Sequence, residues 1–531
     1  MGMLFNSFEF LLFFLPAVTA GFYLLARYRR LAPALLWLIG CSLVFHGYWK
    51  ASYTWLFVAS MLINYGLGLI FWNLAEARTF LRKAVLFIGI GANIAILGYF
   101  KYASFFAEIV RDVTGRLWEP GEIIVPLAIS FYTFQQIAYL VDCYRGHSVR
   151  YSFLQYVSYL AFFPHLIAGP IVHHRELVTQ LSDGRILFVR AQNLLSGIAI
   201  FWIGLFKKVV LADGAAAYAN PIFAAADAGV TLTFSEAWIA ALLFSFVIYF
   251  DFSGYSDMAI GLARLFNVRL PENFASPYKA VNIIEFWRRW HITLSRFLRD
   301  YLYIPLGGNR HGDLRRYGSI LVTMLLGGLW HGASWTFVLW GGLHAVYLIV
   351  AQLWLQAKQA FDLPSGGAIG RFVGRTLTYL AVVVAWIFFR ASTPQAAFSM
   401  AASMAGVNGV SLPSELAVAV QDGLRDIFGA VVSFQGLTPH VELPAGLFGA
   451  PSVSAVALCV VLLIAVNMLP NTQQIMRMFR PVLHDSSERV TGLVRVLVWR
   501  LTPLRVAALA ALGMYGMTQL ETVQPFIYFR F

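Results

Sequence analysis

The chain has 531 residues, of which 59% are hydrophobic and 12% are charged. Because about 25% charged residues is usual for a water-soluble globule, this composition excludes a soluble protein and predicts an all-α protein that crosses a membrane many times. The net charge of +13 does not indicate nucleic-acid binding, since the basic residues lie in short loops between apolar segments, as membrane topology alone requires.

Apolar runs long enough to cross a bilayer, which needs about 20 residues of helix, occur from one end of the chain to the other. They lie near residues 10–26, 33–49, 53–74, 84–100, 122–142, 153–172, 191–212, 234–265, 317–330, 333–357, 372–390, 452–469 and 504–520. Some are expected to be re-entrant or interfacial, so the sequence predicts about 10–13 membrane-embedded helices. Glu9 stands where a signal peptide would have a basic residue, and we therefore expect the first run to be retained as a crossing.

The placement of basic residues predicts the orientation of the chain. They cluster at residues 27–30, 78–83 and 288–316, and by the positive-inside rule these loops face the cytoplasm. The N-terminus is then expected to be extracytoplasmic. Residues 403–451 contain Arg425 as their only basic residue and are rich in Gly and Pro, which predicts an extracytoplasmic loop region. That region is either a docking surface for an exported partner or a plain connector.

Residues 283–304 predict an amphipathic helix on the cytoplasmic side of the membrane. Apolar residues recur there at intervals of three and four, while arginines occupy another face and prevent the helix from spanning the bilayer. Such a helix either anchors the protein to the headgroups of membrane lipids or forms a mouth lined by guanidinium groups for a phosphate-bearing ligand. The candidate binding residues of this segment are Trp287, Arg288, Arg289, Trp290, Ser295, Arg296 and Arg299.

Ionisable side chains inside apolar runs are costly in lipid and therefore mark candidate functional sites. His331 stands in GGLWHGASW and is either a functional residue or a buried histidine with a backbone partner. His291 lies 40 positions earlier, in a similar aromatic block. Asp251 and Asp257, within the apolar run 234–265, are either structural or substrate-orienting.

The spacing of potential ligands predicts no metal site. His165, His173 and His174 lie near one another in sequence, but no carboxylate or cysteine accompanies them at ligand spacing. The cysteines are scattered and show no CxxC spacing.

Long motifs around the two histidines resemble those of a known family. They are 130-SFYTFQQIAYLVDCYRG-146, 162-FFPHLIAGPI-171, 204-GLFKKVVLAD-213, 250-FDFSGYSDMAIGLARLFNVRLPENFASPY-278, 285-EFWRRWHITLSRFLRDYLYIPLGGNR-310 and 324-MLLGGLWHGASWTFVLWGGLH-344. These strings closely resemble the membrane-bound O-acyltransferase (MBOAT) family, and within it the bacterial branch of alginate O-acetyltransferase type. The resemblance spans nearly the whole chain.

The resemblance implies a single MBOAT-like domain over residues 1–531, in the bacterial inner membrane, with a central tunnel. It implies His331 as the catalytic residue and His291 as its companion. Trp330, directly before His331, is a further candidate binding residue. It also implies acetyl-CoA as the donor, with no permanently bound cofactor. An exported periplasmic partner resembling SGNH hydrolases and an exopolysaccharide acceptor, such as alginate, complete the expected system.

The chemistry of acetyl transfer agrees with these roles. A hydroxyl becomes a good nucleophile when a base takes its proton, and imidazole titrates near neutrality, so His331 is the expected general base. His291 would orient the substrate or polarise the thioester carbonyl. An acetyl-His331 intermediate remains an alternative. Other donors or acceptors, such as a D-alanyl carrier protein or peptidoglycan, and a transporter also remain open, although no inverted repeat is evident.

Overall fold

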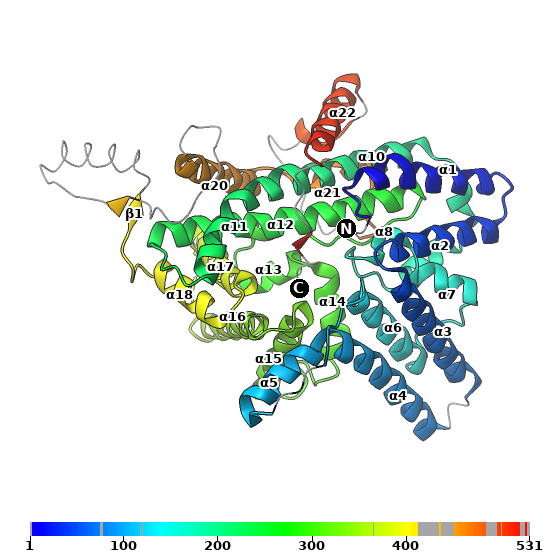
Figure 1. Cartoon of the computed structure of the whole chain (residues 1–531), viewed down its shortest axis with the longest axis horizontal. Helices are drawn as coiled ribbons and strands as arrows, with labels where there is room; N and C mark the ends of the chain where they lie inside the picture. Colours follow the sequence, from blue (N-terminus) through cyan, green and yellow to red (C-terminus); the bar gives the residue numbers. More distant parts are fainter. Residues whose placement is uncertain are drawn as a thin grey trace, which may run out of the picture.

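The computed structural model describes residues 3–74, 78–116, 118, 120–364, 366–412, 435–436, 451–484, 496–500, 502–520 and 526–527. This part of the chain is almost entirely helical (Figure 1), which confirms the all-α class. Its only sheet is a parallel pair of two-residue strands, β1 (Ser411–Leu412) and β2 (Gln435–Gly436). Most of the predicted loop region 403–451 lies outside the described residues.

Along the chain the helices fall into three successive stretches, residues 9–144, 153–265 and 277–518. The first contains η1 (Glu9–Phe14), α1 (Leu15–Ala26), α2 (Leu31–Gly47), α3 (Ala51–Asn73), α4 (Thr79–Leu97), η2 (Gly98–Tyr102), α5 (Ala103–Thr114) and α6 (Ile129–Tyr144). The second contains α7 (Phe153–Leu160), α8 (Phe163–Leu166), α9 (His174–Leu181), η3 (Gly184–Leu187), α10 (Ala191–Phe206), η4 (Lys207–Ala212), α11 (Asp213–Asp227) and α12 (Phe234–Leu265). The third contains η5 (Pro277–Lys279), α13 (Ile283–Arg289), α14 (Ile292–Leu298), η6 (Arg299–Tyr303), α15 (Asp313–His331), α16 (Trp335–Ala360), α17 (Gly367–Arg390), α18 (Pro394–Met404), α20 (Pro451–Met468), α21 (Thr472–Ile475), η7 (Arg477–Phe479) and α22 (Pro503–Thr518).

Many of these helices can cross a membrane. In the described residues, seven helical stretches are long and apolar enough: Glu9–Ala26, Ala51–Asn73, Thr79–Thr114, Ala191–Asp227, Phe234–Leu265, Trp335–Ala360 and Gly367–Arg390. Leu31–Gly47 and Val453–Met468 are shorter apolar helices. All of them overlap runs predicted from the sequence, which confirms a multi-pass membrane protein.

The predicted run 153–172 is not one membrane helix. It forms α7 and α8, which are short and buried against α2 and α12. Pro164 stands at the start of α8, where no helical partner is needed for the N–H that it lacks, whereas inside a continuous helix it would remove a backbone hydrogen bond. Gly169 then packs so closely on the backbone of His165 that an added Cβ would lie 2.6 Å from its Cα. The prediction of a single span here was wrong for these reasons.

Helix α12 forms the centre of the fold and lies in backbone contact with α10 (Figure 1). A Cβ added at Gly204 of α10 would lie 2.6 Å from the carbonyl oxygen of Gly254 in α12. Gly197 and Gly261 repeat this arrangement two turns away, where an added Cβ at Gly197 would lie 2.7 Å from the Gly261 carbonyl oxygen. Small residues thus allow the two helices to approach closely, as in many membrane helix pairs.

The acidic residues of α12 are paired with lysines of η4, directly after α10. Lys207 Nζ lies 2.7 Å from Asp257 Oδ2, and Lys208 Nζ lies 2.6 Å from Asp251 Oδ1. Asp251 Oδ2 also accepts the backbone N–H of Ile527 at 2.9 Å, so Ile527 is held against the same helix. The geometry supports the structural interpretation of both acids rather than a substrate-orienting one.

The segment predicted as one amphipathic helix over residues 283–304 is broken. It forms α13, α14 and η6, and His291 between the first two has φ = 42°, in the left-handed region. The backbone of Asn273 explains the break, because its carbonyl accepts the N–H of Ile292 at 3.0 Å in place of a helical bond. Trp290 is 2% exposed. The segment is therefore partly inserted into the protein and does not lie wholly on its surface.

The helix ends divide the molecule into two faces. The basic face carries the loops at 27–30 and 78–83 and the arginines of 299–316. Arg82 Nη2 donates to the carbonyl of Tyr144 at 3.0 Å, which places the end of α6 on this face. The opposite face carries the α2–α3 loop and the segment before α6, joined by a hydrogen bond from the Tyr53 hydroxyl to the Ile124 carbonyl at 2.9 Å.

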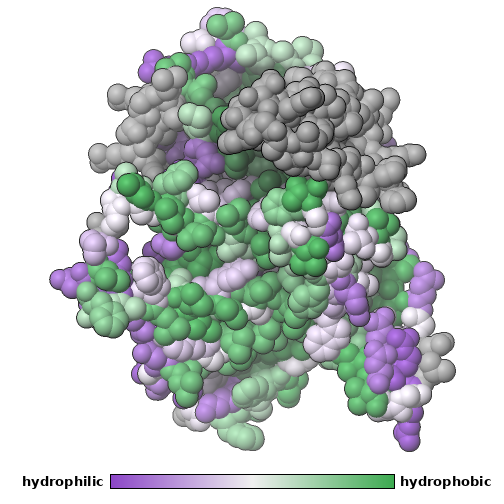
Figure 2. Space-filling view, turned by 90° about the vertical axis from the view of Figure 1, so that its left-hand side faces the viewer, coloured by the Kyte–Doolittle hydropathy of each residue, from purple (hydrophilic) through white to green (hydrophobic). Residues whose placement is uncertain are grey.

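The lateral surface between these faces is rich in apolar side chains, as Figure 2 shows for one side of the molecule. On α16 and α17, exposed examples include Val346, Val350, Trp354, Phe372 and Leu377, with exposed fractions between 52% and 71%. So large an exposed apolar surface suits contact with lipid.

The close α10–α12 contact leads to a prediction about stability. Gly204→Ala should lower the free energy of unfolding by about 1–3 kcal/mol, because the methyl group would overpack against the backbone of α12. Gly214→Ala in α11 is the control, since an added Cβ there meets no atom within 4 Å. That variant should be neutral or more stable by up to about 1 kcal/mol. Thermal unfolding of the detergent-solubilised protein measures both, and equal midpoints for the two variants would contradict the packing argument.

Candidate functional site

His331 is the last residue of α15, and this position sets how deep it lies. The helix begins at Asp313 on the basic face, and its 19 residues rise about 28 Å at 1.5 Å per residue. His331 therefore lies toward the opposite face. Its side chain is 5% exposed and packs against Trp340 and Phe389, with ring centroids 5.1 and 5.2 Å away.

Glycines in the same block bring α15 against α16 and so fix the place of His331. A Cβ on Gly328 would collide with the carbonyl oxygen of Phe337, and a Cβ on Gly341 would collide with that of Met324. The two helices therefore touch through their backbones within about two turns of the histidine. The glycines of this motif therefore allow α15 and α16 to pack closely beside His331.

A cavity of about 120 Å³, here called the His331 cavity, lies beside this imidazole. Its walls contain Trp49, Lys101, Val125, Pro126, Leu127, Ala128, Ile129, Ser130, Phe131, Ile167, Ala168, Trp330 and His331. Trp49 and Val125 belong to the loops of the opposite face, so the cavity connects His331 to that face. The imidazole is buried, but it is not sealed within packed side chains.

A second, smaller cavity of about 20 Å³ approaches from the basic face and is here called the Arg296 cavity. Arg296, Asp300 and Tyr301 line it together with His173, Thr293 and Phe297, among others. Arg296 donates from Nη1 and Nη2 to the two carboxylate oxygens of Glu176, at 2.7 and 2.9 Å. Burial alone would raise the pKa of Glu176, but these hydrogen bonds and the positive charge of Arg296 hold the pKa below its ordinary value. The pair is therefore ionised at neutral pH.

A stack of three aromatic rings lies between the two cavities. Trp330, in the wall of the His331 cavity, stacks on Phe134 with centroids 5.3 Å apart. Phe134 stacks in turn on Phe297, in the wall of the Arg296 cavity, at 4.4 Å. This stack separates the His331 cavity from the Arg296 cavity.

His291 lies beside Trp330 and lines neither of the two cavities. Its ring centroid is 6.3 Å from that of Trp330, which in turn is 4.9 Å from that of His331. His291 Nδ1 lies 3.1 Å from Asn273 Oδ1, and the same oxygen accepts the backbone N–H of Thr293 at 3.4 Å. Because a backbone N–H can only donate, this contact identifies the atom as the amide oxygen. His291 Nδ1 therefore carries a proton, and Nε2 is an acceptor in the neutral ring.

Nε2 of His291 has a second notable property. The atom is buried and has no hydrogen-bond partner among the described residues. A buried acceptor without a partner is costly unless a bound molecule supplies a donor. His291 can thus accept a hydrogen bond from a ligand.

Most of the other predicted binding residues have partners within the protein. Arg289 Nε donates to Glu285 Oε1 at 2.9 Å, and Arg299 Nε donates to Asp300 Oδ1 at 2.7 Å. Arg288 is exposed and lines neither cavity. Of the four arginines in this segment, Arg296 alone lines one of the two cavities.

The remaining predicted residues of the segment serve packing. Trp287 Nε1 donates to His344 Nδ1 at 3.3 Å, and Trp290 stacks on Phe286 with centroids 5.6 Å apart. Ser295 Oγ donates to the carbonyl of Trp290 at 3.4 Å, across the break at His291. These contacts hold α13 and α14 in place beside the site.

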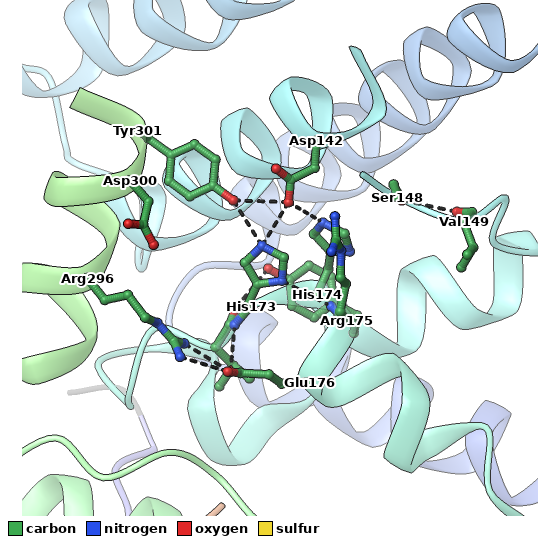
Figure 3. A network of polar contacts seen from close by, with 12 residues as sticks. Asp142, Ser148, Val149, His173, His174, Arg175, Glu176, Arg296, Asp300 and Tyr301 are labelled. Carbon is green, nitrogen blue, oxygen red and sulfur yellow. Dashed lines mark hydrogen bonds and ion pairs between the residues drawn. The ribbon is translucent and has the colours of Figure 1, made fainter. Parts of the chain in front are cut away.

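Figure 3 shows a separate polar cluster at the basic face. Asp142 Oδ2 accepts from His173 Nε2 at 2.8 Å, from His174 Nε2 at 2.9 Å and from the Tyr301 hydroxyl at 3.1 Å. The ligand atoms of Asp142, His173 and His174 lie within 4.8 Å of one another, close enough to hold a metal ion. No carboxylate stands at ligand spacing from these histidines in the sequence, but the fold brings Asp142 to them from the end of α6.

Hydrogen bonding nevertheless accounts for this cluster without an ion. His173 Nδ1 accepts the backbone N–H of Arg175 at 3.4 Å, so Nε2 carries the proton that it donates to Asp142. An imidazole of that tautomer offers no lone pair on Nε2 to a metal. We therefore interpret the cluster as a hydrogen-bond network that ties α6 to α9 and η6.

Two residues beside the histidines were missed by the sequence analysis. Lys101 lines the His331 cavity, and Asn273 fixes the orientation of His291. A lysine at the end of an apolar run is ordinarily an interfacial residue. The position of Lys101 in the sequence therefore did not indicate that it lines the site. Asn273 lies in a loop, and its position in the sequence likewise did not indicate a contact with His291.

Comparisons with known proteins place this geometry in a family. Residues 38–392 match the membrane-bound O-acyltransferase family. The chain is 42% identical to the peptidoglycan O-acetyltransferase of Helicobacter pylori over 438 residues, covering 77% of this chain and 81% of that protein. It is 40% identical to the probable alginate O-acetylase AlgI of Azotobacter vinelandii over 411 residues, covering 76% and 78%.

A more distant relative is named for the transfer of a different acyl group. The teichoic acid D-alanyltransferase of Bacillus subtilis is 28% identical over 285 residues, covering 51% of this chain and 68% of that protein. The family match covers more than half of the chain, and it includes both His291 and His331. This chain belongs to the membrane-bound O-acyltransferase family and is an O-acyltransferase.

Proposed function

We propose that this protein takes acetyl groups from cytoplasmic acetyl-CoA and delivers them, through His331, to a hydroxyl on the extracytoplasmic side of the inner membrane. The observation that carries the proposal is that His331 lines a cavity on the side of one face, while a smaller cavity lies on the side of the other face, across a stack of aromatic rings. The basic face would lie in the cytoplasm, by the positive-inside rule, and the N-terminus outside. The thioester would then enter on the side of Arg296.

His331 is proposed as the general base. Its imidazole would take the proton of the acceptor hydroxyl as the oxygen attacks the thioester carbonyl carbon. A C–O bond forms, the C–S bond breaks, and the thiolate leaves with the proton that His331 returns. A relay through acetyl-His331 would use the same imidazole as the nucleophile, in two successive transfers.

His291 is proposed to orient a substrate rather than to stabilise an oxyanion. Its Nδ1 proton is engaged by Asn273, so the buried Nε2 can accept a hydrogen bond but cannot donate one while the ring is neutral. An acceptor of this kind fits a hydroxyl or an amide N–H of a bound molecule. Between the two roles expected from the sequence, the geometry thus favours orientation.

The acceptor is proposed to be an exported polysaccharide, reached directly or through a periplasmic acetyltransferase of SGNH-hydrolase type. The names of the relatives support a glycan acceptor, since they include an alginate O-acetylase and a peptidoglycan O-acetyltransferase. The His331 cavity, with about 120 Å³, holds a hydroxyl-bearing side chain or the edge of a sugar more readily than a whole chain of sugars.

The donor can be tested in permeabilised host cells that express the full chain. Labelled acetyl-CoA should give base-labile label in the envelope polysaccharide, whereas a D-alanyl carrier protein should give none. Transfer from the carrier protein alone would replace the proposed donor. Absence of transfer from either thioester would contradict the proposal as a whole.

The role of His331 predicts a large effect of its removal. His331→Ala should fold normally but lower acetyl transfer at least about a hundredfold, which is the low end of general-base contributions. His311→Ala is a suitable control, because His311 is exposed at the basic face. The measurement is label transfer normalised to the amount of folded protein. Transfer by His331→Ala at the parental rate would exclude His331 as base and as nucleophile.

The aromatic stack predicts a second effect. Phe134→Ala should join the two cavities and admit water, so hydrolysis of acetyl-CoA without an acceptor should rise several-fold. Phe106→Ala, at a half-exposed ring of α5, is the control. Release of free thiol by the purified protein measures the hydrolysis. An unchanged rate in a folded Phe134→Ala variant would show that the stack does not separate donor from water.

A further inference from the structure

We infer that Lys101 is a positioning residue that holds the C-terminal end of α15, and with it His331, in the geometry needed for transfer. The inference deepens the proposed function, because it rests on His331 being the reacting residue. It concerns a side chain that does not itself need to touch the substrate.

The ammonium group of Lys101 lies at the end of α15. Its Nζ donates to the carbonyl oxygen of Trp330 at 2.6 Å and to that of His331 at 3.2 Å. A third contact, at 3.5 Å, joins Nζ to Ser130 Oγ at the start of α6. An ammonium group has three protons to donate, and three oxygens lie within reach. Lys101 therefore acts as a clamp between α15 and α6 and has no proton left over for a ligand.

The next residue, Tyr102, strengthens the same clamp. Its hydroxyl donates to the carbonyl of Leu329 at 2.9 Å. The last four carbonyls of a helix have no partner within the helix, and Lys101 and Tyr102 together supply partners for those of Leu329, Trp330 and His331. Both come from η2, so a single turn of another helix satisfies most of the end of α15.

The local backbone explains why side chains are needed there. Helices often end with a left-handed residue whose N–H bonds back to the final carbonyls. Gly332 is extended instead, with φ = −161° and ψ = 150°. The chain thus leaves α15 directly, and the final carbonyls depend on donors from elsewhere.

The charge of Lys101 suits this position. The C-terminal end of a helix carries partial negative charge, which a nearby cation stabilises. All three acceptors of Lys101 are neutral oxygens, so its ammonium is held by the helix end and a hydroxyl. A reacting group misplaced by about 1 Å can lose about a hundredfold in rate, so fraying of the last turn at His331 would impair transfer.

The test compares three variants in the permeabilised-cell assay with labelled acetyl-CoA. Lys101→Met, which removes the charge and the donors, should lower the maximal rate at least tenfold and leave the KM for acetyl-CoA within twofold. Lys101→Arg keeps a cation with donors and should recover at least a third of the parental rate. Lys50→Met removes a lysine that is exposed on the same face, beside Tyr53, and should behave like the parent.

A second measurement does not depend on activity. Diethyl pyrocarbonate modifies accessible imidazoles, and mass spectrometry of the peptide that contains His331 gives the rate at that residue. In Lys101→Met the rate should rise several-fold because the last turn of α15 frays, and in Lys101→Arg it should return toward the parental value.

The outcomes separate this inference from the proposed function. A parental maximal rate and an unchanged modification rate in Lys101→Met would overturn the clamp, as would a Lys101→Arg variant no better than Lys101→Met. An active His331→Ala variant, assayed in parallel, would instead overturn the role of His331. If Lys101→Met does not fold, Lys101→Gln replaces it, and a parental rate in that folded variant would likewise overturn the clamp.

Discussion

A polar group carried into the bilayer must find its partner within the protein, because hydrocarbon offers none. This constraint explains the main contacts of the fold. Lys207 and Lys208 enter the core beside α12 and pair there with Asp257 and Asp251. The same requirement at the end of α15 is met by Lys101, which supplies protons to carbonyls that would otherwise be unsatisfied. The ion pairs of α12 and the contacts of Lys101 thus both follow from the need to pair buried polar groups within the protein.

The site combines close backbone packing with two restricted approaches. Glycines allow α15 and α16 to touch beside His331, so the imidazole sits on a rigid pair of helices. The rings of Trp330, Phe134 and Phe297 separate the cavity of the basic face from that of the opposite face. A reaction that joins a thioester from one side to a hydroxyl from the other needs such a barrier, since water admitted to the thioester would compete with the acceptor.

The two histidines are held by different means, and this suits different tasks. His291 is fixed through Nδ1 by the side chain of Asn273, which leaves Nε2 as an acceptor. His331 is held through its backbone carbonyl, at the end of a helix, and its ring lines a cavity. The ring of His331 thus reaches its cavity through its position at the end of α15, whereas the ring of His291 is oriented through one of its nitrogens.

The sequence by itself determined the class of the protein and most of its crossings, because apolar runs of the required length are a local property of the chain. It also indicated His331 and His291, through motifs that are contiguous in sequence. Only the tertiary structure decided the break at His291, the pairing of Asp142 with His173 and the contact of Lys101 with α15. Each of these joins segments far apart in the chain, as with Lys101 and His331, 230 positions apart. Spacing along one sequence carries no information about which distant segments meet, since that depends on how the helices pack.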